Sequence, residues 1–144
     1  MKVVAYLTHP LGPKDADQSG RANNVANAVA WVRWIIESTT WAINASWLTH
    51  VIAIDDEIHR PRALVDQMAQ LVRCDALILV GGWMSPHMRV EHQFAMKRRI
   101  PIVDLVSLGY SPPYAGQPPP FPIKNWSDWF HQQASLPILP LQPT

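Results

Sequence analysis

Residues 74–91, with the sequence CDALILVGGWMSPHMRVE, decide the fold that we expect for this chain. Within them the apolar run 76–80 is short, lacks polar alternation and stops at a double glycine, which is typical of a strand buried on both faces. Ser85 and Pro86 then predict the start of a helix, because a serine hydroxyl can cap free backbone N–H groups and a proline ring pre-sets the first helical φ. Glu91 falls on the second turn of that helix. The sequence therefore predicts a carboxylate just beyond the carboxyl end of a buried strand, where open α/β sheets bind ligands.

Strands and helices are predicted to alternate along most of the chain. Strands are expected at residues 3–8, 47–54, 76–80 and 100–106, and helices at residues 21–38, at 61–73 and from Pro86 onward. The apolar residues that recur every three or four positions should form the inward faces of the first two helices: Val25, Ala28, Val29, Val32, Ile35 and Ile36, then Leu64, Val65, Met68, Leu71 and Val72. Such an alternation predicts an α/β fold, a three-layer αβα sandwich in which helices cover both faces of a parallel sheet.

The length of 144 residues suits one domain and is too short for two. We expect that domain to span residues 1–110. Residues 111–144 are expected to form a proline-rich C-terminal arm with one short helix, at residues 125–133, because prolines on both sides of that segment exclude other regular structure. The arm is expected to lie on the domain or on a neighbouring subunit; the alternative is that a proline-recognising module binds it.

Composition argues against several classes of partner. The 12 Lys and Arg residues and the 11 Asp and Glu residues are scattered, so no nucleic acid polymer is expected to bind. The basic run 97–99 comes where a helix should end, and the helix dipole explains it. A single cysteine allows no internal disulfide, and no apolar stretch approaches the length of a membrane span. We therefore expect a soluble, cytoplasmic protein with no membrane partner.

The seven tryptophans are many for a domain of this size. Trp31, Trp34, Trp41, Trp126 and Trp129 are not expected to fit together into one small core. Because exposed aromatic patches usually mark interfaces, the chain is expected to form a homo-oligomer.

Motifs for common cofactors are missing from the sequence. No G-x-G-x-x-G follows the first strand, and there is no G-x-x-x-x-G-K-[ST]. The sequence therefore does not indicate binding of a dinucleotide or of a nucleoside triphosphate. His87 and His92 are five positions apart and would not share a helix face as zinc ligands do. Ser85 does not lie in a G-x-S-x-G elbow. We expect neither a metal nor a cofactor.

With these motifs missing, the chemistry that the residues of the crevice best support is that of a carboxylate. In a doubly wound sheet the end of the first strand, with Tyr6, Thr8 and His9, lies beside residues 81–85, and Glu91 should project near this crevice. The Tyr6 phenol could orient the Glu91 carboxylate, and an oriented carboxylate is a competent nucleophile at an anomeric carbon, where the transition state is cationic. The alternative is that Glu91 is a solvated helix residue paired with a nearby arginine.

Several short motifs across residues 1–108 resemble the nucleoside 2-deoxyribosyltransferase superfamily, which includes deoxynucleoside 5′-monophosphate N-glycosidases. The matching motifs are Tyr6-Leu7, Arg21-x-x-Asn24-Val25, Cys74-Asp75 and Gly82-Trp83-x-Ser85-x-x-x-x-x-Glu91-x-x-x-Ala95. The resemblance implies a flavodoxin-like (Rossmann-like) sheet. It also implies cleavage of the N-glycosidic bond of a 2′-deoxynucleoside or its 5′-monophosphate, by a hydrolase or a deoxyribosyltransferase.

The resemblance assigns roles to matching residues. Glu91 would be the nucleophile that forms a covalent glycosyl intermediate, Tyr6 would orient it, and Ser85 would contact the sugar or its 5′-phosphate. An aspartate at the start of the second helix would serve the nucleobase. Asp66 is the nearest match in spacing, and Asp55 and Asp56 are the alternatives.

Other residues near the crevice are candidates for substrate binding. These are Arg21, which could neutralise a phosphate, Trp83, which could stack on a base, and His9, Gly82, His87 and Met88. His87 stands where the family usually has glycine, and it would narrow the space at the helix start. A different function is therefore kept open: a nucleotide-binding or sensor module that retains the fold without the chemistry.

Overall fold

The computed structural model describes residues 2–12 and 18–106, and the expected C-terminal arm with its short helix lies outside these residues. The elements follow one another in the order β1 (Val4–Thr8), α1 (Gln18–Ser38), β2 (Ala42–Asn44), α2 (Trp47–Ala53), α3 (Arg60–Leu71), β3 (Ala76–Leu79), α4 (Pro86–Arg98) and β4 (Ile102–Asp104).

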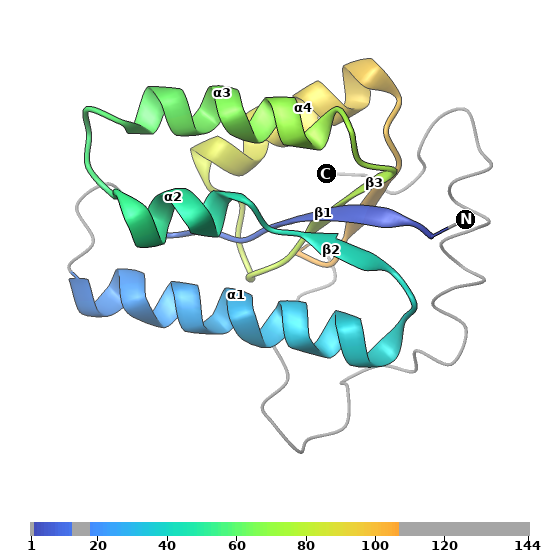
Figure 1. Ribbon diagram of the computed structural model, residues 1–144, viewed down its shortest axis with the longest axis horizontal. Coiled ribbons are helices and arrows are strands. Elements are labelled where there is room, and N and C mark those ends of the chain that lie inside the picture. Colours follow the sequence, from blue (N-terminus) through green and yellow to red (C-terminus); the bar gives the residue numbers. More distant parts are fainter. Residues whose placement is uncertain (1, 13–17, 107–144) are drawn as a thin grey trace.

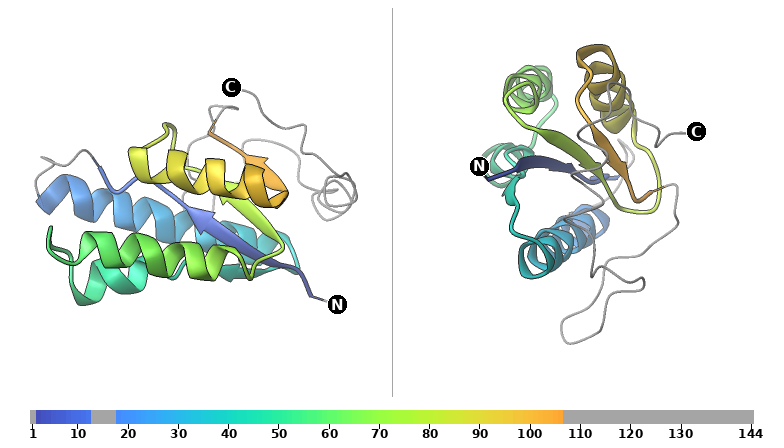
Figure 2. Two further views of the ribbon diagram at one scale, coloured as in Figure 1. Left: turned by 90° about the horizontal axis from the view of Figure 1, so that it is seen from above. Right: turned by 90° about the vertical axis from the view of Figure 1, so that its right-hand side faces the viewer.

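The strands form one parallel sheet in the order β2-β1-β3-β4 (Figure 1). β1 is central and pairs with both β2 and β3, so that Ala5 lies opposite Ile43 on one side and Ala76 on the other. Figure 2 shows α1 on one face of the sheet and α3 and α4 on the opposite face. The predicted α/β fold with a parallel, flavodoxin-like sheet is confirmed.

Side chains that alternate along β1 and β3 supply two apolar cores, one on each face of the sheet. The core on the face of α1 includes Ala5, Leu7, Trp31, Trp34, Ile35, Ala76 and Ile78. The core on the face of α3 and α4 includes Tyr6, Leu71, Leu77, Leu79, Met88 and Ala95. The whole of β3 is buried, as the unbroken apolar run in the sequence predicts.

The prediction of a strand at residues 47–54 is wrong, because this segment forms α2 and the second strand is the short β2 that precedes it. The segment is rich in β-branched residues, which favours a strand locally. Trp47 is the one α2 residue that is fully buried, and its indole Nε1 donates a hydrogen bond to the Leu7 carbonyl at 2.7 Å. Packing of one helical face against the core outweighs the local preference, and it leaves Ile52 exposed.

The predicted inward face of α1 is confirmed at Ala28 and Ile35, which are fully buried, but not at its edge. Val29 and Ile36 are 52% and 55% exposed, whereas Trp31 and Trp34 are buried and contact each other edge to face. The reason is size, because an indole buries more apolar surface than a branched aliphatic side chain. Trp41 is buried as well. These three tryptophans therefore give no support to a homo-oligomer.

The helix start at Ser85 is confirmed. Ser85 is the extended N-cap residue of α4, its Oγ accepts a hydrogen bond from Met88 N at 3.2 Å, and Pro86 is the first helical residue. At the other end Lys97 and Arg98 occupy the last turn, where they complement the helix dipole, and Arg99 closes the helix in a left-handed conformation. No helix within the described residues is long and apolar enough to span a membrane.

Because β3 lies inside the sheet, a cavity made in it should destabilise the protein. Leu77→Ala removes a fully buried side chain from β3 and should lower the free energy of unfolding by about 2–5 kcal/mol. Ile58→Ala is the control, because Ile58 is 84% exposed and its truncation should change stability by less than about 0.5 kcal/mol. Urea unfolding followed by tryptophan fluorescence measures both, and equal effects of the two substitutions would contradict the described core.

Candidate functional site

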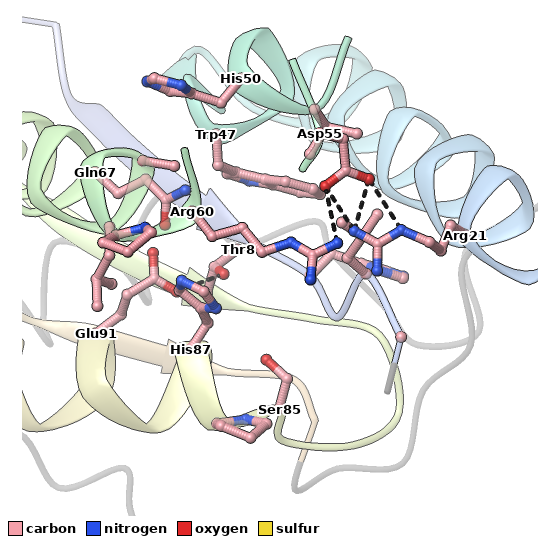
Figure 3. Close-up of a pocket in the computed structure, with 18 of the residues that line it drawn as sticks. Thr8, Arg21, Trp47, His50, Asp55, Arg60, Gln67, Ser85, His87 and Glu91 are labelled. Carbon is pink, nitrogen blue, oxygen red and sulfur yellow. Dashed lines mark hydrogen bonds and ion pairs between the residues drawn. The ribbon is translucent and has the colours of Figure 1, made fainter. Parts of the chain in front are cut away.

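A pocket of about 890 Å³ opens at the carboxyl ends of β1 and β3, the edge of the sheet where the sequence predicts a ligand site. Its walls come from the loops after both strands and from α1 to α4. Figure 3 shows Thr8, Arg21, Trp47, Gln67 and Glu91, one residue from each surrounding element, around this space.

Glu91 lies at the bottom of the pocket and is only 1% exposed. Its Oε1 accepts a hydrogen bond from Thr8 Oγ1 at 2.7 Å, and its Oε2 is buried without a hydrogen-bond partner among the described residues. No described cation pairs with it. The alternative interpretation of Glu91 as a solvated residue paired with an arginine is therefore wrong.

Tyr6 lies behind Glu91, in the core rather than in the pocket wall. Tyr6 and Thr8 are two residues apart on β1, so both side chains point to the face of the sheet that carries α4. The Tyr6 hydroxyl and Glu91 Oε2 are both buried and form no close hydrogen bond with a described residue. The two groups nevertheless interact, because burial and then the Glu91 carboxylate raise the pKa of the Tyr6 phenol.

Burial also dominates the protonation of Glu91. It raises the pKa of the Glu91 carboxyl from 4.5 to about 7, while the hydrogen bond from Thr8, and after it the nearby Tyr6 phenol, oppose the shift. A carboxylate with such a pKa is partly ionised at neutral pH. Titratable groups with pKa values near the working pH are typical of sites that carry out chemistry.

An ion pair at the pocket rim joins α1 to the segment before α3. The Arg21 guanidinium donates to both oxygens of Asp55 over 2.6–2.9 Å, and Arg60 reaches the same carboxylate at 3.5 Å. All three residues line the pocket (Figure 3). Two guanidinium groups thus share the Asp55 carboxylate, and the Glu57 carboxylate lines the same pocket.

The loops after β1 and β3 touch each other, as the parallel strands predict. Gly81 has a positive φ of 112°, and a Cβ built on it would lie only 2.3 Å from Pro10 Cδ. Only glycine fits at this contact. His9, in the loop after β1, is buried in the pocket wall, its Nδ1 lies 2.7 Å from the Pro10 carbonyl oxygen, and burial lowers its pKa.

The amino end of α4 forms another part of the wall. Ser85 and His87 line the pocket there, and Trp83 lines it from the preceding loop. Partial desolvation and the nearby Arg60 charge lower the pKa of His87, which disfavours a charged imidazole. The backbone N–H groups of Met88 and Arg89 are bonded to Ser85, so that of His87 is the first-turn donor without a partner among the described residues.

Some predicted site residues lie outside the pocket. Asp66 does not line it and pairs with His50, which does, and with Arg62, at 2.9 Å and 3.2 Å. Asp56 pairs with His59 at the surface, so Asp55 alone of the three aspartates lines the pocket. Met88 and Gly82 also fall outside the pocket wall, and Met88 is part of the core instead.

Many residues that line the pocket were not predicted as site residues, among them Trp47, Arg60 and Gln67. Thr8 was placed at the crevice but given no role, although the period of two along β1 puts it on the same face as Tyr6. Arg60 and Gln67 are separated by two helical turns on α3, a spacing that puts both on one side of the helix. No sequence signal shows which side of α3 meets the pocket.

Within residues 2–12 and 18–106, no three His, Cys, Asp or Glu side chains lie together as a metal site would require. Comparison with protein-family models, with curated proteins and with solved structures finds no match to this chain.

The raised pKa of Glu91 predicts a pH-dependent stability. The unfolded chain ionises Glu91 near pH 4.5 and the folded protein only near pH 7, so stability should fall as pH rises through this interval, by about 3 kcal/mol in all. Glu91→Gln removes the ionisation and should be more stable than the parent protein at pH 8 but not at pH 4. Denaturant unfolding at both pH values measures this, with the exposed Glu37→Gln as control. A Glu91→Gln effect that does not change with pH would contradict the assignment.

Proposed function

We propose that this protein cleaves the N-glycosidic bond of a 2′-deoxynucleoside or its 5′-monophosphate, with Glu91 as the nucleophile. The observation that carries the proposal is the Glu91 carboxylate, buried at the bottom of a pocket, fixed by Thr8 and not neutralised by any described cation. The sequence motifs that resemble the nucleoside 2-deoxyribosyltransferase superfamily add the substrate class. Their central residues, Ser85 and Glu91, both line this pocket.

The reaction would proceed in two displacements at C1′ of the sugar. A Glu91 oxygen forms a bond to C1′ while the bond from C1′ to the base nitrogen breaks, and its electron pair leaves with the base, which takes up a proton from water. A water oxygen then bonds to C1′, loses a proton and displaces Glu91 as a carboxylate. If a second base replaces water, the same steps give a transferase.

The pocket suits a ligand of this class. Its volume of about 890 Å³ lies within the range of small-molecule sites, which is about 300–1,000 Å³. Trp47 and Trp83 contribute aromatic surface for a planar base. Thr8 and Tyr6 act on Glu91 rather than on the ligand, and each favours the ionised carboxylate.

The opposite end of the pocket would hold an anion. The Ser85 hydroxyl and the His87 backbone N–H at the start of α4 offer hydrogen-bond donors, and Arg21 and Arg60 offer positive charge. A 5′-phosphate there would compete with Asp55 for the two guanidinium groups, and it carries more negative charge than a carboxylate. We therefore expect a 5′-monophosphate to be the preferred form of the substrate.

Loss of the nucleophile provides the main test of this function. Glu91→Ala should reduce base release by at least about a thousandfold, and Thr8→Val by about tenfold, since Thr8 contributes one hydrogen bond to a charged group. Glu37→Gln, on the exposed face of α1, should leave the rate unchanged. The wild-type rate should rise with pH through about 7, as Glu91 ionises.

Free base is measured by chromatography after incubation with the four deoxynucleosides and their 5′-monophosphates. Near wild-type release by Glu91→Ala would refute its role. Tight nucleotide binding without any base release by the wild-type protein would favour the alternative, a nucleotide-binding or sensor module.

The proposed anion site near Ser85, Arg21 and Arg60 predicts that a 5′-monophosphate and its nucleoside bind with different affinities. A 5′-monophosphate should bind the Glu91→Gln protein about tenfold more tightly than its nucleoside, because a charged hydrogen bond to arginine contributes about 1.5–3 kcal/mol. Arg60→Gln should remove most of this difference, and Arg33→Gln, at an exposed ion pair on α1, should not. Titration calorimetry measures both ligands. Equal affinities would favour a plain nucleoside substrate.

A further inference from the structure

Gln67 is a buried polar residue in the pocket wall that the mechanism above does not use. Its side chain is 8% exposed and lines the pocket, yet its amide forms no hydrogen bond with a described residue. Figure 3 shows Gln67 and Glu91 directed into the same space from α3 and α4. The part of the Gln67 side chain that is still exposed therefore faces the pocket, where a ligand would contact it.

The geometry of α3 explains why Gln67 faces the pocket and Asp66 does not. Arg60, Ala63, Leu64 and Gln67 recur at helical spacing and all line the pocket. Asp66 lies about a third of a turn away, where His50 and Arg62 bind it. The neighbours of Gln67 on the pocket side, Ala63 and Leu64, are apolar and cannot satisfy its amide.

The Gln67 amide is open to the pocket and is not among the fully buried polar groups without a partner, so solvent in the pocket can hydrogen-bond with it in the free protein. A ligand that fills this part of the pocket must replace those hydrogen bonds, or binding loses their contribution. The ligand must offer both a donor and an acceptor, because the amide carries one NH₂ group and one carbonyl oxygen side by side.

We propose that Gln67 determines specificity by binding the edge of the nucleobase. This inference rests on the proposed function, since it names the part of the substrate that α3 recognises. A nucleobase presents a donor next to an acceptor at its edge, as adenine does with its amino group and N7, and an amide side chain pairs with both. Trp47 lines the same pocket and offers an aromatic face to the ring. A sugar phosphate without a base has no such edge.

The test compares ligands with and without a base. Binding is measured by calorimetry in the Glu91→Gln protein, which should not turn over, with the four deoxynucleoside 5′-monophosphates and with 1,2-dideoxyribose 5-phosphate. Adding Gln67→Leu should weaken binding of at least one monophosphate about tenfold and leave the baseless sugar phosphate unchanged. Gln70→Leu is the matched control, because Gln70 lies on α3 outside the pocket and binds Asn44.

Thermal unfolding separates recognition from a structural role. Gln67→Leu should unfold at the same temperature as the parent protein or at a higher one. A lower unfolding temperature, an equal loss of affinity for both kinds of ligand, or no loss for any monophosphate would each overturn the role of Gln67. Base release by the wild-type chain tests the glycosidase separately. If no base is released but binding still depends on Gln67, base recognition stands and the glycosidase proposal fails.

Discussion

The hydrogen bond from Thr8 to Glu91 joins the end of β1 to the second turn of α4, across 83 positions of sequence. It is possible only because β1 lies next to β3, so that the helix that follows β3 begins beside the end of β1. The pocket exists at this same meeting point of two parallel strands. The adjacency of β1 and β3 therefore determines both where α4 begins and where the Glu91 carboxylate lies.

The burial of Glu91 follows from the way α4 is attached to the sheet. Met88, Glu91 and Ala95 are spaced by three and four positions and form the buried face of the helix. The apolar members of this face hold α4 against the sheet, and the carboxylate between them is carried into the same low-dielectric surroundings. A side chain one position away would be exposed, as Val90 is. The energy for burying the charge comes from the packing of its neighbours on the helix.

The sequence predicted the structure correctly where a single local pattern, unopposed by any other, determined the conformation. The unbroken apolar run of β3 and the cap at Ser85 predicted the fold class and the position of Glu91, since both depend on short-range rules. It was insufficient where tertiary packing decided between two local preferences. Residues 47–54 have strand propensity but form a helix that buries Trp47, and α1 buries Trp31 and Trp34 together with Ile35 while Val29 and Ile36 are exposed.

The residues of the pocket show the same limit. Asp66 and Gln67 are adjacent in sequence, and only the rotation of α3 about its axis determines that the amide rather than the carboxylate lines the pocket. That rotation is set by contacts with α2 and α4, which a periodic pattern alone does not specify. Spacing from a known motif therefore pointed to a helix that lines the pocket, but not to the side chains by which it does so.

The low-dielectric surroundings that raise the pKa of Glu91 also favour the proposed chemistry. Low dielectric surroundings disfavour the ionised carboxylate in the free protein, and they also strengthen its attraction to any positive charge that develops beside it. In glycosidic bond cleavage that charge develops on the sugar only as the bond to the base breaks. A neutral ground state gains little from the buried carboxylate, whereas the cationic transition state gains much more. Such a difference between the two states is the condition for catalysis, and Asp55, which pairs with both Arg21 and Arg60, reduces the effect of their positive charge on it.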